Sequence, residues 1–186
     1  MGTDFTAVVN HNLNPQDIQT LPDLLNSTWH TIEHVLPIRE GYPVADSSPD
    51  KWEWSEYRGY SLERLLDHNT VSVSNHEFHG GASDRVFRVS AGVRWRSFLT
   101  DQVVREKLRS VCRHLASVFG SNQIIYLPSA FCKQEAAISL MYEGKGVEEM
   151  TDWLLENCGP PAQSIESIYR QVHESWEGDG YYIERL

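Results

Sequence analysis

An unbroken alternation of apolar and polar side chains from Phe87 to Arg96 constrains the fold more than any other feature of this sequence. Successive side chains of a β-strand point to opposite faces, so alternation predicts a strand with one buried face. The apolar positions are Phe87, Val89, Ala91, Val93 and Trp95. A slip of one residue would bury Arg88, Arg94 and Arg96, so the pattern fixes which face meets the core.

This strand is expected to form a hairpin with residues 70–76, where Val71 and Val73 alternate with serines. Residues 78–84 contain two adjacent glycines, which tolerate turn conformations, and are expected to form the loop between the two strands. Further strands are expected over residues 5–9, 123–127 and 181–183. The sequence therefore predicts a sheet with a central hairpin over about residues 70–96.

Helices are predicted where apolar side chains recur at helical spacing. The longest runs from about Ser97 to Phe119, and Gly120 is a natural C-terminal stop. Asn14 and Pro15 are typical of a helix start. The other predicted helices cover residues 21–36, 129–143, 147–157 and 164–176. We expect one α+β domain over residues 1–186, with a mixed or antiparallel sheet covered by helices.

The charge is unevenly distributed along the 186 residues, whose net charge is -10. Residues 1–60 carry 3 basic and 9 acidic side chains, residues 61–120 carry 9 and 6, and residues 121–186 carry 4 and 11. An acidic chain lacks the basic footprint that general nucleic-acid binding requires. An acidic surface instead favours a basic protein partner.

A cytoplasmic location is expected. The three cysteines, Cys112, Cys132 and Cys158, form neither an even disulfide framework nor a Cys-x-x-Cys pair, which is typical of a reducing compartment. No apolar stretch approaches the roughly 18–20 residues of a membrane helix. The first ten residues lack the pattern of a secretory signal. The sequence leaves the oligomeric state open.

The segment from Lys51 to Tyr57 mixes aromatic and acidic side chains and is the first candidate binding site. Exposed tryptophans are common at the centre of protein interfaces, and a rim of carboxylates would attract a basic partner. The predicted site comprises Trp52, Trp54 and Tyr57 with Glu53 and Glu56. The alternative is a short strand in which both tryptophans are buried.

The arginines on the polar face of the long strand form a secondary binding candidate, Arg88, Arg94 and Arg96. The guanidinium fork binds carboxylates and phosphates, so this face could meet an acidic ligand. The alternative is a solvated face, or arginines paired with acidic side chains of a covering element. Arg105, Arg109 and Arg113 follow on the next predicted helix at a spacing of four residues. Such a stripe of charge usually lies on the solvent-exposed face of a helix.

The string His30-Thr31-Ile32-Glu33-His34 matches a zinc hydrolase pattern, with two histidine ligands and a glutamate that activates water. His76 and His79 could complete a zinc site only if these segments meet. At about 100° per residue, however, His30 and His34 point away from the apolar side of their helix. We therefore expect exposed histidines, no metal and no cofactor.

Nucleotide-binding and nucleophile-elbow motifs are absent from the sequence. We expect a non-catalytic cytosolic interaction protein that binds or neutralises a basic partner, analogous in size and charge to immunity or inhibitor proteins. The alternative is a small metal-dependent hydrolase with His30 and His34 as ligands and Glu33 as the catalytic base.

Overall fold

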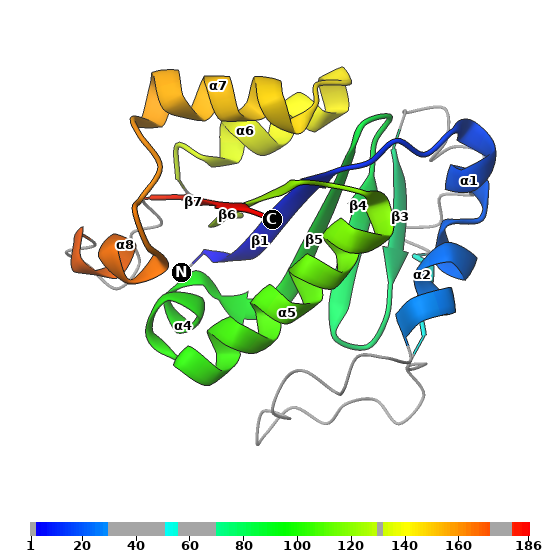
Figure 1. Ribbon diagram of the computed structural model, residues 1–186, viewed down its shortest axis with the longest axis horizontal. Helices are drawn as coiled ribbons and strands as arrows, with labels where there is room; N and C mark the ends of the chain where they lie inside the picture. Colours follow the sequence, from blue (N-terminus) through cyan, green and yellow to red (C-terminus); the bar gives the residue numbers. More distant parts are fainter. Residues whose placement is uncertain (1–2, 30–50, 56–69, 130–131, 172–179) are drawn as a thin grey trace.

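Phe87, Val89 and Ala91 lie on one face of a strand, β5 (Val86–Arg94), in the computed structural model, which describes residues 3–29, 51–55, 70–129, 132–171 and 180–186. Within those residues, seven strands form one sheet in the order β2-β3-β4-β5-β1-β6-β7 (Figure 1). Every neighbouring pair is antiparallel, which confirms the predicted α+β fold. The other strands are β1 (Asp4–Asn10), β2 (Glu53–Trp54), β3 (Val71–Ser74), β4 (Phe78–Ala82), β6 (Gln123–Pro128) and β7 (Tyr182–Arg185).

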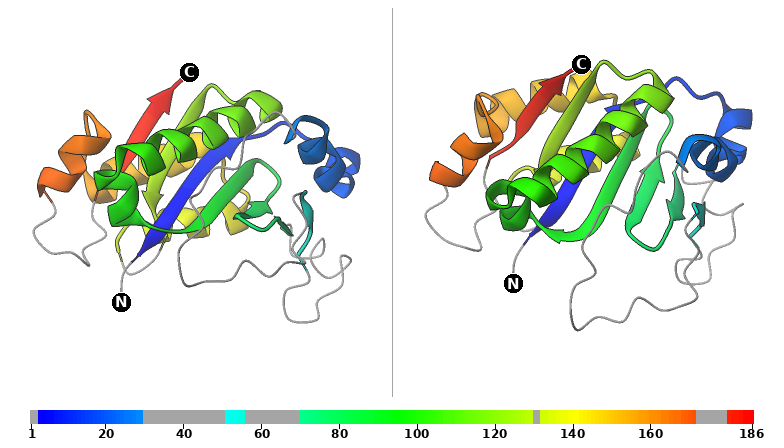
Figure 2. Two further views of the ribbon diagram at one scale, coloured as in Figure 1. Left: turned by 90° about the horizontal axis from the view of Figure 1, so that it is seen from below. Right: turned by 60° about the horizontal axis from the view of Figure 1, so that its bottom comes forward.

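Helices cover both faces of the sheet (Figures 1 and 2). On one side lie α2 (Leu21–Trp29), α4 (Trp95–Thr100) and α5 (Gln102–Phe119). On the other lie α6 (Glu135–Ser139), the 3-10 helix η1 (Leu140–Glu143) and α7 (Val147–Cys158). The remaining helices of the described chain are α1 (Pro15–Gln19) and α8 (Ile165–Gln171). The ends predicted for two helices, 30–36 and 172–176, lie outside the described residues.

The larger core fills the space between the sheet and α5. Phe87, Val89 and Trp95 are buried in it with the apolar side of α5, as the alternation predicts, and Val93 packs against them half-buried. The α5 side chains in this core are Val104, Leu108, Val111, Cys112, Leu115, Ala116 and Phe119. Gly120 adopts φ 68°, so the predicted helix stop is confirmed.

The predicted strand over residues 86–96 is two residues too long, because Trp95 already begins α4. The single helix predicted from Ser97 to Phe119 is in fact two helices. Asp101 separates them: its carboxylate accepts hydrogen bonds from the backbone N–H groups of Val103 (2.9 Å) and Val104 (3.1 Å). This N-cap starts α5, although the apolar periodicity runs across both helices.

Residues 78–84 are not a loop, as predicted, but mainly a strand, β4, between β3 and β5. The hairpin is therefore a three-stranded meander. Two short turns replace the loop; in the first, Asn75 Oδ1 accepts hydrogen bonds from the backbone of Glu77 and Phe78. Gly80 occupies the middle of β4 opposite Val73 and Val89, so this glycine serves close packing rather than a turn.

A second, smaller core joins the sheet to α6, η1 and α7. Its strand residues come from β1, β5 and β6: Val8, Val86, Ile125 and Leu127. Its helix residues include Ala137, Met141, Met150 and Leu154. None of the described residues of β3 or β4 belongs to this core, so the second helical layer is anchored to only part of the sheet.

None of the helices in the described chain combines the length and the apolar character needed to cross a membrane.

Candidate functional site

The two helical layers carry opposite charge. On one side, residues 95–119, which contain α4 and α5, carry five basic and two acidic side chains, and α2 adds Asp23, which gives this layer a net charge of +2. From Glu135 to Cys158, α6, η1 and α7 carry one basic and six acidic side chains, a net charge of -5. These helices lie on opposite sides of the sheet (Figure 1). The charge pattern along the sequence thus becomes a difference between the two sides.

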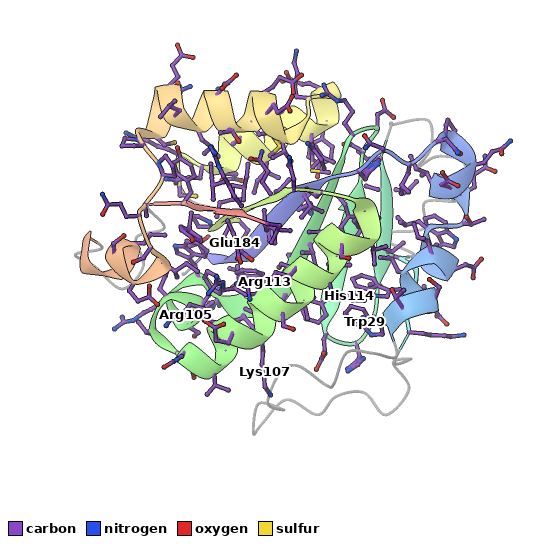
Figure 3. The ribbon with its side chains drawn as sticks, viewed as in Figure 1. Trp29, Arg105, Lys107, Arg113, His114 and Glu184 are labelled. Carbon is purple, nitrogen blue, oxygen red and sulfur yellow. The ribbon has the colours of Figure 1, made fainter. Side chains whose placement is uncertain are left out.

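The arginines of α5 are held by carboxylates of the C-terminal segments. Arg105 is buried and lies 2.9 Å from Glu166 on α8. Arg109 and Arg113 both donate to Glu184 on β7, with Arg113 Nε at 2.6 Å, and Figure 3 shows Arg113 directed toward Glu184. The prediction that these arginines lie on a solvent-exposed helix face is therefore wrong for Arg105 and Arg109.

Glu184 is the centre of this network and is only 6% exposed. Its carboxylate also accepts a 2.8 Å hydrogen bond from the hydroxyl group of buried Tyr126. Burial raises the pKa of Glu184, but hydrogen bonds from Arg109, Tyr126 and Arg113 outweigh it and hold the pKa below its ordinary value. An ionised carboxylate with these partners ties β7 to α5, so the arginines stabilise the fold.

The acidic layer, in contrast, presents its carboxylates to solvent. Val147, Met150 and Leu154 of α7 are buried against the sheet. At about 100° per residue, the opposite side of the helix carries a set that we call the α7 outer face: Glu148, Glu149, Asp152, Leu155 and Glu156. Only Glu149 has an ion-pair partner described by the structure, Arg85 at 2.7 Å, and α7 itself contains no basic residue.

An exposed apolar side chain lies within the α7 outer face. Leu155 is 53% exposed and lies at one edge of the acidic row around the helix, about 20° from Glu148. Tyr142 of η1, in the same layer, is also 53% exposed. Leu155 with carboxylates along one side gives the α7 outer face an apolar contact beside acidic groups, a combination that protein interfaces commonly have.

The first predicted binding site is only partly compatible with the structure. Trp52 is 1% exposed and belongs to the larger core, so its predicted role as an exposed contact is wrong. The Asn26 side chain fixes its backbone by a 2.7 Å and a 2.8 Å hydrogen bond. Trp54 lies on the short strand β2, as the alternative predicts, but it is half-buried against the same core and not fully buried. Glu53 is exposed beside Lys51, and Glu56 and Tyr57 lie outside the described residues.

The structure separates the three arginines of the secondary candidate. Arg88 lies on the face of β5 that points away from α5, opposite Val8 of β1. Arg94 is on the same strand but donates a 2.9 Å hydrogen bond to Asp4. Arg96 belongs to α4, not to the strand, and is exposed there. The interpretation of one continuous arginine face is therefore wrong.

His30, Glu33 and His34 lie outside the described residues, so the zinc hydrolase pattern stays a prediction. His76 is in the turn before β4, 3.7 Å from Glu77, and His79 is exposed on β4. The part of the chain that the structure describes contains no group of three or more potential metal ligands. Two further histidines have structural contacts: His11 near Ser83, and His114, which bonds to Thr28 beside Trp29 (Figure 3).

Comparison with protein-family models, with curated proteins and with solved structures gives no match.

Proposed function

We propose that this protein is a non-catalytic binding protein that takes up a basic protein partner on the α7 outer face. The observation that carries the proposal is the row Glu148, Asp152 and Glu156, which lies beside exposed Leu155 on a helix without basic residues. A surface of this kind speeds the approach of a cationic partner, and burial of the exposed leucine then slows its dissociation.

The opposite layer supports the same assignment. Arg105 and Arg109 are engaged by Glu166 and Glu184, so they contribute little to an accessible basic surface. A general affinity for nucleic acid requires many accessible cationic side chains, and the acidic layer would repel a phosphate backbone. We infer a protein partner and no general nucleic-acid binding.

We also propose a cytoplasmic location. Cys112, Cys132 and Cys158 form no disulfide. Burial raises the pKa of the Cys112 thiol, which keeps it protonated and unreactive. Three cysteines without a disulfide are typical of proteins of a reducing compartment.

Partner capture with matched variants tests the proposed function. The α7 triple variant is Glu148→Gln, Asp152→Asn and Glu156→Gln. The control triple variant is Glu53→Gln, Asp84→Asn and Glu106→Gln, which removes three exposed carboxylates elsewhere and gives the same net charge. Extract from the native host is applied to each immobilised protein, and the captured proteins are identified by mass spectrometry.

We expect a basic protein that the parent and the control triple variant retain and that the α7 triple variant loses. A captured protein that is acidic, or that both triple variants bind equally, would contradict the proposal.

A further inference from the structure

Thr6 of β1 holds a buried hydroxyl group without a partner. The side chain is 1% exposed, and its Oγ1 atom makes no hydrogen bond. Such a group costs free energy unless something pairs with it, because it has lost its contact with water.

The register of the sheet shows where Thr6 points. Thr6 is opposite Leu127 of β6 and Ser90 of β5, and Leu127 belongs to the smaller core. Directly opposed residues share a face, so Thr6 and Ser90 lie on the face away from α5. The next pair along the same two strands is Val8 and Arg88, which places Arg88 diagonally beside Thr6 on that face.

Arg88 has the same unusual property as Thr6. Its Nε atom is shielded from solvent and has no hydrogen-bond partner. A guanidinium N–H donor and a threonine hydroxyl group, both unsatisfied, are therefore diagonal neighbours on one face. Ser90 completes the group: the only hydrogen bond of its hydroxyl group in the described structure is a long one, 3.4 Å to the carbonyl oxygen of His79.

This group lies where the second helical layer ends. The neighbouring residues on the same face of β4 are Gly81, opposite Arg88, and His79, opposite Ser90. Ser72 of β3 follows opposite Gly81. A Cβ atom added at Gly81 would have only the Val71 carbonyl oxygen within 4 Å, at 3.9 Å, so there is room above the sheet at the position opposite Arg88. The nearest acidic group along β1 is Asp4, and it is paired with Arg94 at 2.9 Å.

We propose that Thr6, Arg88 and Ser90 form a binding site for a small oxyanion, such as a phosphate or carboxylate group. Arg88 supplies the charge and a fork of donors, and the hydroxyl groups donate from the neighbouring strand positions. Phosphate accepts hydrogen bonds from more directions than carboxylate, so it fits donors from two strands better. This site is independent of the α7 outer face.

Titration of the full chain with inorganic phosphate, and separately with acetate, tests the site. The readouts are calorimetry and the amide signals of Thr6 and Ser90 in a ¹H–¹⁵N spectrum, with ionic strength held constant by sodium chloride. We expect saturable binding of phosphate, weaker binding of acetate, and shifts at those two amides. Saturation by acetate alone would still support an oxyanion site and would assign it to carboxylates.

Three variants locate the binding. Arg88→Gln should weaken it about tenfold, as the loss of a charge-assisted hydrogen bond predicts. Thr6→Val should weaken it without lowering stability in the absence of phosphate, because the hydroxyl group has no hydrogen bond to lose. Arg96→Gln, which removes an exposed arginine on α4, should change nothing.

Thr6→Val keeps the test valid if Arg88→Gln does not fold. The proposal is overturned if neither anion shows saturable binding, if Thr6→Val binds as tightly as the parent, or if Arg96→Gln weakens binding as much as the Thr6 and Arg88 variants do.

Discussion

Gly80 lies so close to Phe87 that a Cβ atom at position 80 would be 2.5 Å from Cζ of the ring. Phe87 is fully buried and cannot move aside. We therefore expect Gly80→Ala to lower the free energy of unfolding by about 1–3 kcal/mol, the usual cost of overpacking a core. Urea denaturation followed by tryptophan fluorescence measures the change.

Gly81→Ala is the matched control for Gly80→Ala. The nearest atom to a Cβ at position 81 is the Val71 carbonyl oxygen at 3.9 Å, an ordinary contact. Alanine also restricts the unfolded chain, so stability should be unchanged or higher by about 0.5 kcal/mol. Equal destabilisation by both substitutions would show that β4 needs glycine for its backbone and not for packing on Phe87.

Glu184→Gln removes the charge that Arg109, Arg113 and Tyr126 share. Buried donors would then face a neutral amide, so we expect a loss of about 1–3 kcal/mol in the free energy of unfolding. Glu53→Gln removes an exposed carboxylate 3.5 Å from Lys51 and should cost less than about 1 kcal/mol. If the two variants unfold at the same urea concentration, the Glu184 network does not hold β7 to α5.

His11 should make stability depend on pH. Its Nε2 lies 2.7 Å from the Ser83 carbonyl oxygen, and its Nδ1 accepts from the Leu13 N–H, so the folded protein holds the neutral ring. Burial lowers the pKa of His11 below 6.5. As the pH falls below 6.5, the unfolded chain takes up the proton first, and the free energy of unfolding decreases until the folded pKa is passed.

Urea denaturation at several pH values between 7.5 and 5 checks this dependence. In the variant His11→Gln, the free energy of unfolding should decrease less with falling pH than it does in the parent. Burial also lowers the pKa of His114, so His114→Gln serves as a second variant that separates the two contributions. A parent decrease that His11→Gln leaves unaltered would exclude His11 as its source.

Trp52 and Trp54 should contribute different amounts to the free energy of unfolding. Trp52 packs edge-on against Trp29 and is buried, so Trp52→Ala should cost about 3–5 kcal/mol. Trp54 is half-buried at the margin of the core, and Trp54→Ala should cost clearly less. Thermal unfolding of both variants compares them. A Trp52→Ala protein as stable as the parent would mean that this side chain is not a core anchor.

The sequence could predict those parts of the fold that depend on local periodicity. The alternation of Phe87, Val89 and Ala91 identified the buried face of β5 because a strand repeats every two residues. It failed at Trp95, which continues the alternation but begins α4. β4 was missed because Gly80 and Gly81 are typical of turns, and the ring that requires Gly80 comes from another strand.

The candidate site was predictable in part. Val147, Met150 and Leu154 show in the sequence which side of α7 is buried, and the same periodicity places Glu148, Asp152 and Glu156 outside. The aromatic segment around Trp52 was predicted as a binding site instead. That prediction was wrong for Trp52 because its burial depends on the distant residues Asn26, Trp29 and Phe78. The ion pair between Arg109 and Glu184, which are 75 residues apart, has no local signal in the sequence.

The association rate of the captured basic partner tests the central claim most directly. It is measured by stopped flow for the parent, the α7 triple variant and the control triple variant at several salt concentrations. We expect the parent rate to fall with salt, because the attraction is screened over about 8–10 Å. The α7 triple variant should associate several-fold more slowly at low salt, and the control triple variant at nearly the parent rate. Equal rates for the two triple variants, or rates indifferent to salt, would contradict the assignment of the α7 outer face as the binding surface.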